Sequence, residues 1–164
     1  MIFGIMITLF LLSLLFLEVN EEDSGEAILG MEFVSSQRYY YYFKLDSNRI
    51  LTVLRGTPIP DEWIDPSHQK TLDSIELSSV RRRGRRELSE QEFDEIIRLA
   101  DTIDVMNVDW EYKLHTGRIG TIIYYNDKRH SARIVSPSYQ IGAEIYILHL
   151  HDKLIELSPI EISS

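Results

Sequence analysis

The chain contains no cysteine among its 164 residues. Disulfides, thiolate nucleophiles, zinc–thiolate sites and lipid attachment through cysteine are therefore excluded. Basic residues are outnumbered as well: 17 Lys and Arg stand against 26 Asp and Glu, which gives a net charge of −9. That balance does not favour nucleic acid as a partner. The sequence also lacks a glycosylation sequon, a phosphate-binding loop, a dinucleotide fingerprint and a Gly-x-Ser-x-Gly motif, so it predicts no cofactor.

The amino-terminal residues 1–17 carry no charged side chain and are almost entirely apolar. As a helix they would span roughly 26 Å, slightly less than a hydrocarbon core of about 30 Å. We predict an uncleaved transmembrane anchor at 1–17. A cleaved signal segment is the alternative, although no small residues lie near Leu17 and no basic side chain precedes the apolar run. A buried core helix is the third interpretation.

The segment 18–27 is acidic and includes a Ser24-Gly25 break, so we expect a short linker there. No Lys or Arg occurs before Arg38, and the acidic residues are a further hint that this side of the anchor is exported. The predicted location is the cell membrane, crossed once, with the bulk of the chain extracytoplasmic. Secretion is the alternative if residues 1–17 are removed.

Residues 28–164 are expected to form a single α+β domain. Turn formers at 46–48 separate two β-rich runs, 37–45 and 49–55, which predicts a hairpin. The proline-containing segment 57–68 is expected to be a loop, and 72–80 a further strand. Later in the chain, three runs with turn signals between them predict an antiparallel meander over residues 109–114, 118–125 and 128–135.

Two amphipathic helices are predicted. Ser89 and Glu92 are spaced as a capping box, and Leu88 and Phe93 as a hydrophobic staple. The apolar face of the helix that follows consists of Phe93, Ile96, Ile97, Leu99, Ala100 and Ile103. The second helix, 141–156, has a wider apolar surface, so either it lies between two layers or part of it meets a partner. Strands and helices in this order predict an antiparallel sheet with both helices on one face.

The string Tyr39 to Phe43 consists entirely of aromatic residues. In a strand, Tyr40 and Tyr42 point away from the face that carries the other three side chains. They either pack across strands on the second face or form an exposed aromatic platform for sugar rings or a peptide. Tyr124 and Tyr125 show the same two-faced pattern.

Five arginines lie within six residues: Arg81, Arg82, Arg83, Arg85 and Arg86. Without them the chain would hold twelve basic and twenty-six acidic residues, a balance of −14. One interpretation is a solvated loop that is compensated by Glu87, Glu90 and Glu92. Another is an anion site, because arginine matches phosphate and carboxylate groups with two parallel hydrogen bonds. An exposed protease cleavage site is a third.

The histidines do not form a metal-binding pattern, and no metal site is predicted. His149 and His151 are two residues apart on a helix and cannot hold one ion together, and we expect both at the boundary of the core. His130 follows Lys128 and Arg129 on a strand, where a surface position is expected.

Two alternatives to a simple binding protein remain at this level. A cell-envelope hydrolase would use the carboxylates Asp61, Glu62 and Asp65 beside Trp63, which could line a sugar site. An inhibitor or immunity-type protein would present the proline-containing loop 57–66 to its target.

The favoured hypothesis is a membrane-tethered, extracytoplasmic and non-enzymatic binding module. Its predicted partners are the membrane itself, through residues 1–17, and an anionic envelope polymer, a lipid headgroup or a protein. The predicted contact residues are Arg81, Arg82, Arg83, Arg85, Arg86, Tyr40, Tyr42 and Trp63.

Overall fold

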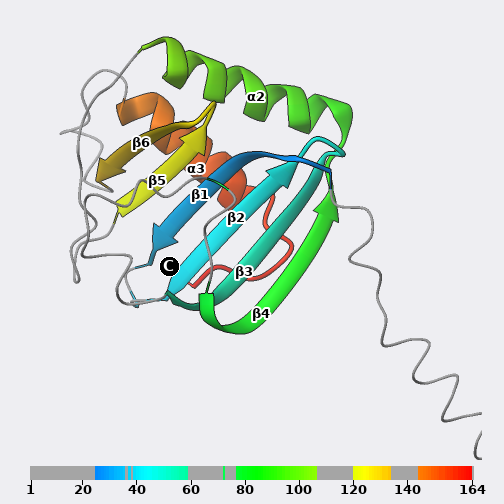
Figure 1. Cartoon of the computed structure of the whole chain (residues 1–164), viewed down its shortest axis with the longest axis vertical. Helices are drawn as coiled ribbons and strands as arrows, with labels where there is room; N and C mark the ends of the chain where they lie inside the picture. The colour runs from blue at the N-terminus through cyan, green and yellow to red at the C-terminus, as the bar shows by residue number, and fades with distance from the viewer. Residues whose placement is uncertain are drawn as a thin grey trace, which may run out of the picture.

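The structure, a computed structural model, describes residues 25–35, 37, 39–58, 72, 77–106, 120–133 and 144–163. Its described strands form one six-stranded antiparallel sheet in the order β4-β3-β2-β1-β5-β6, accompanied by two helices (Figure 1). The predicted α+β class with an antiparallel sheet is therefore confirmed. The predicted anchor 1–17 and most of the predicted linker 18–27 lie outside the described residues.

The described strands fall into two groups along the chain, β1 to β4 before helix α2 and β5 and β6 after it. Their bounds are β1 Ala27–Val34, β2 Tyr40–Asp46, β3 Ile50–Pro58, β4 Leu77–Glu87, β5 Gly120–Tyr125 and β6 Lys128–Arg133. The helices are α2 Glu90–Val105 and α3 Glu144–Glu156. The strand that the sequence predicts at 72–80 is displaced, since β4 begins at Leu77 and continues through the arginine run.

Two hairpins form where the turn residues predict them. Between β2 and β3 the Asp46 carboxylate accepts hydrogen bonds from the backbone N–H groups of Asn48 (3.0 Å) and Ile50 (2.9 Å). Between β5 and β6, Asn126 and Asp127 both have positive φ, at 49° and 58°. Two successive residues of this kind are what a two-residue hairpin turn requires, and Asn and Asp adopt that conformation more readily than most residues do.

Strand β1 connects the two halves of the sheet. It pairs with β2 on one side and with β5 on the other, so that Met31 lies opposite both Phe43 and Ile123. The sequence-based meander is wrong in one respect. It placed residues 109–114 beside β5, whereas the two neighbours of β5 are β1 and β6. Residues 109–114 themselves lie outside the described residues.

Helix α2 begins as its sequence predicts. The Ser89 hydroxyl oxygen accepts a hydrogen bond from the Glu92 N–H (3.2 Å), and the Glu92 carboxylate accepts one from the Ser89 N–H (2.9 Å), which completes the capping box. Of the predicted apolar face, Ile96, Ala100 and Ile103 are buried. The other three members pack against the core while partly exposed: Phe93, Ile97 and Leu99.

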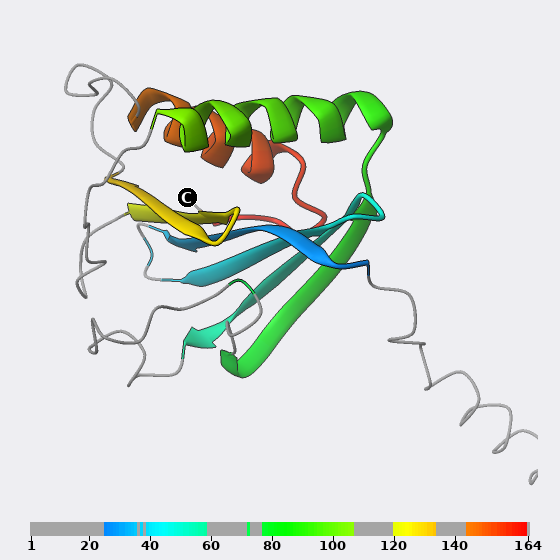
Figure 2. The same ribbon diagram turned by 45° about the horizontal axis from the view of Figure 1, so that its top comes forward.

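Helix α3 has contacts on two sides, and this explains its wide apolar surface. It meets α2 along one side and strands β5 and β6 along another. Its side chains Ile147, Leu148, Leu150 and Leu154 are all buried. Both helices lie over the same face of the sheet (Figure 2). Contacts with α2 and with the sheet thus favour the packed alternative for these four residues.

The chain after α3 completes this face. Leu157 is buried, and the Ser163 N–H donates a hydrogen bond to the Tyr41 hydroxyl oxygen (3.1 Å). A Cβ atom at Gly84 would lie 2.7 Å from Ile160 Cγ2 and 2.9 Å from Pro159 Cγ. Glycine in β4 therefore allows this tail to approach the strand backbone closely.

The capping box yields a direct test of the α2 start. Replacing Ser89 with alanine removes the acceptor for the Glu92 N–H, and we expect the free energy of unfolding to fall by about 1 kcal/mol. Chemical denaturation measures this change. Ser47→Ala is the matched control, because Ser47 lies in an exposed turn. An equal loss in both variants would contradict a specific contribution from the cap.

Candidate functional site

The arginine run lies in an edge strand rather than in a loop. Residues Arg81 to Arg86 all belong to β4, which pairs with β3 along its length, with an irregularity at Arg81. The expectation of a solvated loop is therefore wrong. A run of like charges has no apolar alternation to indicate a strand, but pairing with the adjacent β3 and the close approach of the tail at Gly84 fix it as one.

Arg86 differs from the other four because it is paired inside the molecule. Its guanidinium lies 2.6 Å from the Glu92 carboxylate and donates a hydrogen bond to the Leu157 carbonyl oxygen (3.3 Å). The Ser89 backbone N–H, followed by the Ser89 hydroxyl and Arg86, lowers the pKa of Glu92 from its ordinary value. Arg86 thus joins β4 to the start of α2 and to the chain after α3.

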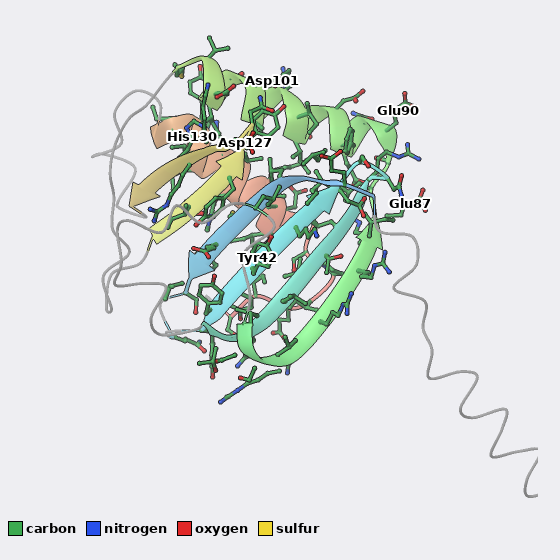
Figure 3. The ribbon with its side chains drawn as sticks, in the orientation of Figure 1. Tyr42, Glu87, Glu90, Asp101, Asp127 and His130 are labelled. Carbon is green, nitrogen blue, oxygen red and sulfur yellow. The ribbon has the colours of Figure 1, made fainter. Side chains whose placement is uncertain are left out.

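The acidic residues that follow the run do not neutralise it. Of the three expected to do so, only Glu92 pairs with an arginine of the run. Glu87 pairs instead with Arg49 at 3.4 Å, and no described base lies within ion-pair distance of Glu90. Figure 3 shows Glu87 and Glu90 near the end of β4 where the chain turns into α2. The compensation that the sequence suggested is therefore restricted to Arg86.

The remaining arginines form what we call the arginine edge: Arg81, Arg82, Arg83 and Arg85. All four are exposed, and none makes an ion pair with a carboxylate of the part of the chain that the structure describes. Arg82 also lies opposite Arg55 of β3 in the strand register. Like charges that face each other across two strands destabilise a sheet unless an anion lies near. Among the described residues no carboxylate offsets the charge of this surface.

Arg55 is held in place by the ring of Tyr39. Its guanidinium carbon lies 3.6 Å from the centre of the Tyr39 ring, which is a cation–π contact, and its Nε atom is buried without a hydrogen-bond partner. Tyr39 thus has an identifiable role beside the arginine edge. The sequence string of aromatics gave no signal for this pairing, because Arg55 comes from the next strand.

Tyr40 and Tyr42 do not form an exposed platform. Their side chains are 3% and 4% exposed, so the sequence-based expectation of an accessible aromatic surface is wrong at both positions. The Tyr42 hydroxyl donates a hydrogen bond to the Leu72 carbonyl oxygen (3.2 Å), and Gly30 leaves room for the Leu72 side chain against the sheet. In Figure 3 Tyr42 lies in the middle of the sheet. The packed alternative is the one that the structure supports.

A buried carboxylate, which the sequence analysis did not identify, lies on this second face. Glu32 of β1 is 2% exposed and lies opposite Tyr42 on one side and Ile122 on the other. The Tyr124 hydroxyl donates a hydrogen bond to it (3.2 Å). The available signal was a single acid in the otherwise uncharged strand sequence AILGMEFV, on the same face as the tyrosines.

Burial and Glu32 also affect the protonation of two of the neighbouring tyrosines. Burial is the main cause that raises the pKa of Tyr40 and of Tyr124 above the ordinary value, and the neighbouring Glu32 charge adds to it. The raised pKa keeps both hydroxyls protonated at neutral pH. The buried Glu32 carboxyl has a hydrogen-bond donor in the Tyr124 hydroxyl, as buried polar groups require.

The histidines occupy positions other than those expected. His130 is buried rather than at the surface, and its Nε2 atom lies 3.9 Å from the Asp104 carboxylate. Burial lowers its pKa, and Asp104 opposes that shift. His151 is buried against the Phe33 ring, with centroids 4.6 Å apart, and burial lowers its pKa to about 4. No group of three potential metal ligands occurs among the described residues.

The Asp104 carboxylate links the β5–β6 turn to the end of α2. It accepts hydrogen bonds from Lys128 Nζ (2.6 Å) and from the Asn126 side-chain amide (3.2 Å), and these lower its pKa. The Tyr125 hydroxyl donates to Asp101 at 2.6 Å in the same region, where Figure 3 labels Asp101, Asp127 and His130. These charges are paired internally, so we assign them a structural role.

Trp63 and the carboxylates Asp61, Glu62 and Asp65 lie outside the described residues, so the hydrolase interpretation stays a prediction. Comparison of the chain with protein-family models, with curated proteins and with solved structures gives no match in any of the three. Within the described ranges, neither helix is long and apolar enough to span a bilayer.

The buried ring of His151 predicts a pH-dependent stability. Its pKa of about 4 in the folded chain is below the ordinary 6.5, so the unfolded chain binds the proton first as pH falls. Stability should therefore be lost between about pH 6.5 and pH 4, by about 3 kcal/mol from this group. Thermal unfolding across this range measures the loss.

The variant His151→Leu should make this loss smaller, because leucine fills the site without a titratable ring. His149→Leu, on the exposed side of the same helix, is the matched control and should retain the full loss. If the two variants lose stability in parallel with the unaltered chain, another group is responsible for the acid sensitivity.

Proposed function

We propose that this protein is a membrane-tethered, extracytoplasmic binding module that recognises an anionic partner through the arginine edge. The observation that carries the proposal is the set of four exposed guanidinium groups without a described carboxylate partner, in a chain of net charge −9. An acidic protein has ample carboxylates to neutralise its own arginines. Leaving four of them unpaired on one strand is consistent with a role in binding an external anion.

The geometry of the arginine edge concentrates positive charge, which favours binding of an anion. Arg55 adds a fifth positive charge directly opposite Arg82, and its position is fixed by Tyr39. A ligand anion that lies near both guanidiniums would relieve the repulsion between them. Arg86 has partners inside the molecule, so we assign it to the fold and not to the ligand.

Tethering is proposed on the sequence of residues 1–17 alone. An uncharged apolar stretch of this length, followed by acidic residues and by no early Lys or Arg, favours an anchor with the remaining chain outside. At that location an arginine-bearing surface would meet anionic lipid headgroups, envelope polymers and other exported proteins.

A binding role is preferred to catalysis on the chemistry of the described residues. The buried tyrosines keep their protons, and the Glu32 carboxylate is enclosed by the sheet rather than presented to solvent. The arginine edge has the donors to hold an anion, but an arginine is a poor general acid or base at neutral pH because it does not lose its proton.

Localisation tests the tether. We expect the full chain, expressed with a carboxy-terminal tag, to fractionate with membranes and to be digested when intact cells are treated with protease. Cells that are permeabilised before the digestion serve as the positive control for cleavage. A chain that is soluble, and protected until the cells are opened, would contradict the proposed location.

The arginine edge is tested by charge reversal in the full chain, kept in a neutral detergent. The double variant Arg83→Glu/Arg85→Glu should elute from a sulfated-polysaccharide column at a markedly lower salt concentration than the unaltered chain, because anion binding is electrostatic. Arg98→Glu/Arg129→Glu gives the same change of net charge at exposed positions away from the edge. Equal shifts for both doubles would show that overall charge, and not the edge, controls retention.

A further inference from the structure

We infer that the arginine edge recognises an acidic polypeptide segment that is bound in extended form as an additional strand alongside β4. This inference rests on the proposed function, that the edge binds an anion, and it names the partner class. The sheet order places β4 at one margin of the sheet, with β3 as its neighbour on the other side among the described strands. Over residues 81–87 no described strand pairs with the side of β4 that points away from β3, so its outward backbone groups can accept a further ladder of hydrogen bonds.

The length of β4 suits this role. It has eleven residues, more than any other described strand, and its pairing with β3 extends from Leu77 to Glu87. The strand covers roughly 36 Å at about 3.3 Å per residue. The opposite margin of the sheet is less suitable, because β6 has six residues and its Lys128 is already paired with Asp104.

The distribution of the arginines over both faces of the sheet favours an extended polypeptide over a flat membrane surface as the ligand. Arg83 and Arg85 lie opposite Leu54 and Thr52 in the register, whereas Arg82 lies opposite Arg55. Alternation along the strand therefore sends Arg83 and Arg85 to one face of the sheet and Arg82 to the other. A membrane surface would meet the guanidiniums of one face at a time. A strand that runs beside β4 reaches both faces, provided that it carries neighbouring acidic residues.

The same charges specify which strand can bind. A second copy of β4 would bring arginine against arginine and is repelled, which also protects this exposed edge from self-association. An acidic segment is attracted instead, since each of its carboxylates can pair with a guanidinium of the arginine edge. The ligand that fits is thus an uninterrupted run of several residues with adjacent Glu or Asp and without proline.

The experiment uses the full chain in neutral detergent and two fluorescent eight-residue peptides. Both contain four glutamates, two of them adjacent. The first has Val and Thr at the other positions, and the second has prolines there, so that the charge is the same but the ladder is interrupted. We expect the first peptide to bind at least about tenfold more tightly. It should also slow amide hydrogen exchange within residues 77–87, which the proline peptide should not do.

Matched variants of the protein complete the design. Arg83→Glu/Arg85→Glu should weaken the first peptide by about tenfold or more, and Arg98→Glu/Arg129→Glu should leave its affinity within about twofold. Exchange protection of α2, measured in the same samples, reports whether each variant remains folded.

The outcomes separate this inference from the proposed function. If both peptides bind with equal affinity and Arg83→Glu/Arg85→Glu weakens both, the added strand is overturned. Anion binding by the arginine edge, which is the proposed function, would then be retained. Binding to detergent micelles that contain phosphatidylglycerol, weakened by Arg83→Glu/Arg85→Glu and without binding to either peptide, would overturn the inference in favour of a membrane surface. If the peptides, the phosphatidylglycerol micelles and the sulfated polymer all fail to bind, both the inference and the proposed function are overturned.

Discussion

The pairing of β1 with β5 is the interaction on which the rest of the structure depends. It is the one connection within the described sheet that joins strands from the two halves of the chain. Without it, β1 to β4 would form one sheet, and the β5–β6 hairpin would be separate from it. Helix α3 packs on β5, β6 and α2, so its position depends on this pairing as well. Because β1 is central, both of its edges are paired, and its single acid is buried with the Tyr124 hydroxyl as a hydrogen-bond donor.

Local features of the fold could be predicted from the sequence, and non-local ones could not. The α2 capping box and the two hairpin turns are encoded within a few adjacent residues, and all three are present. The neighbour of β5 was misassigned, since no local pattern indicates that residues about ninety positions apart will pair. The arginine run was misread for a related reason. Its strand conformation results from β3 and from the tail at Gly84, whereas its own composition indicates a loop.

The candidate site could be predicted only in part, because its local features are visible in the sequence and its tertiary contacts are not. The unusual density of arginine was evident in sequence, but which of them has a partner depends on tertiary contacts, and only Arg86 meets Glu92. The tyrosines were judged by the periodicity of one strand, which indicates two faces but not what covers each. Glu32 is thus buried inside the sheet, whereas Arg81, Arg82, Arg83 and Arg85 lie exposed along its margin.

The contact between Gly84 and the chain after α3 has a consequence for biosynthesis. Translation proceeds from the amino terminus, so β4 emerges from the ribosome long before Pro159 and Ile160, which cover it at Gly84, have been made. During that interval one surface of β4 is uncovered, and Arg86 lacks the Leu157 carbonyl oxygen that accepts its hydrogen bond. The first four strands can begin to pair as they are made, whereas the completed sheet has to wait for β5, α3 and the tail.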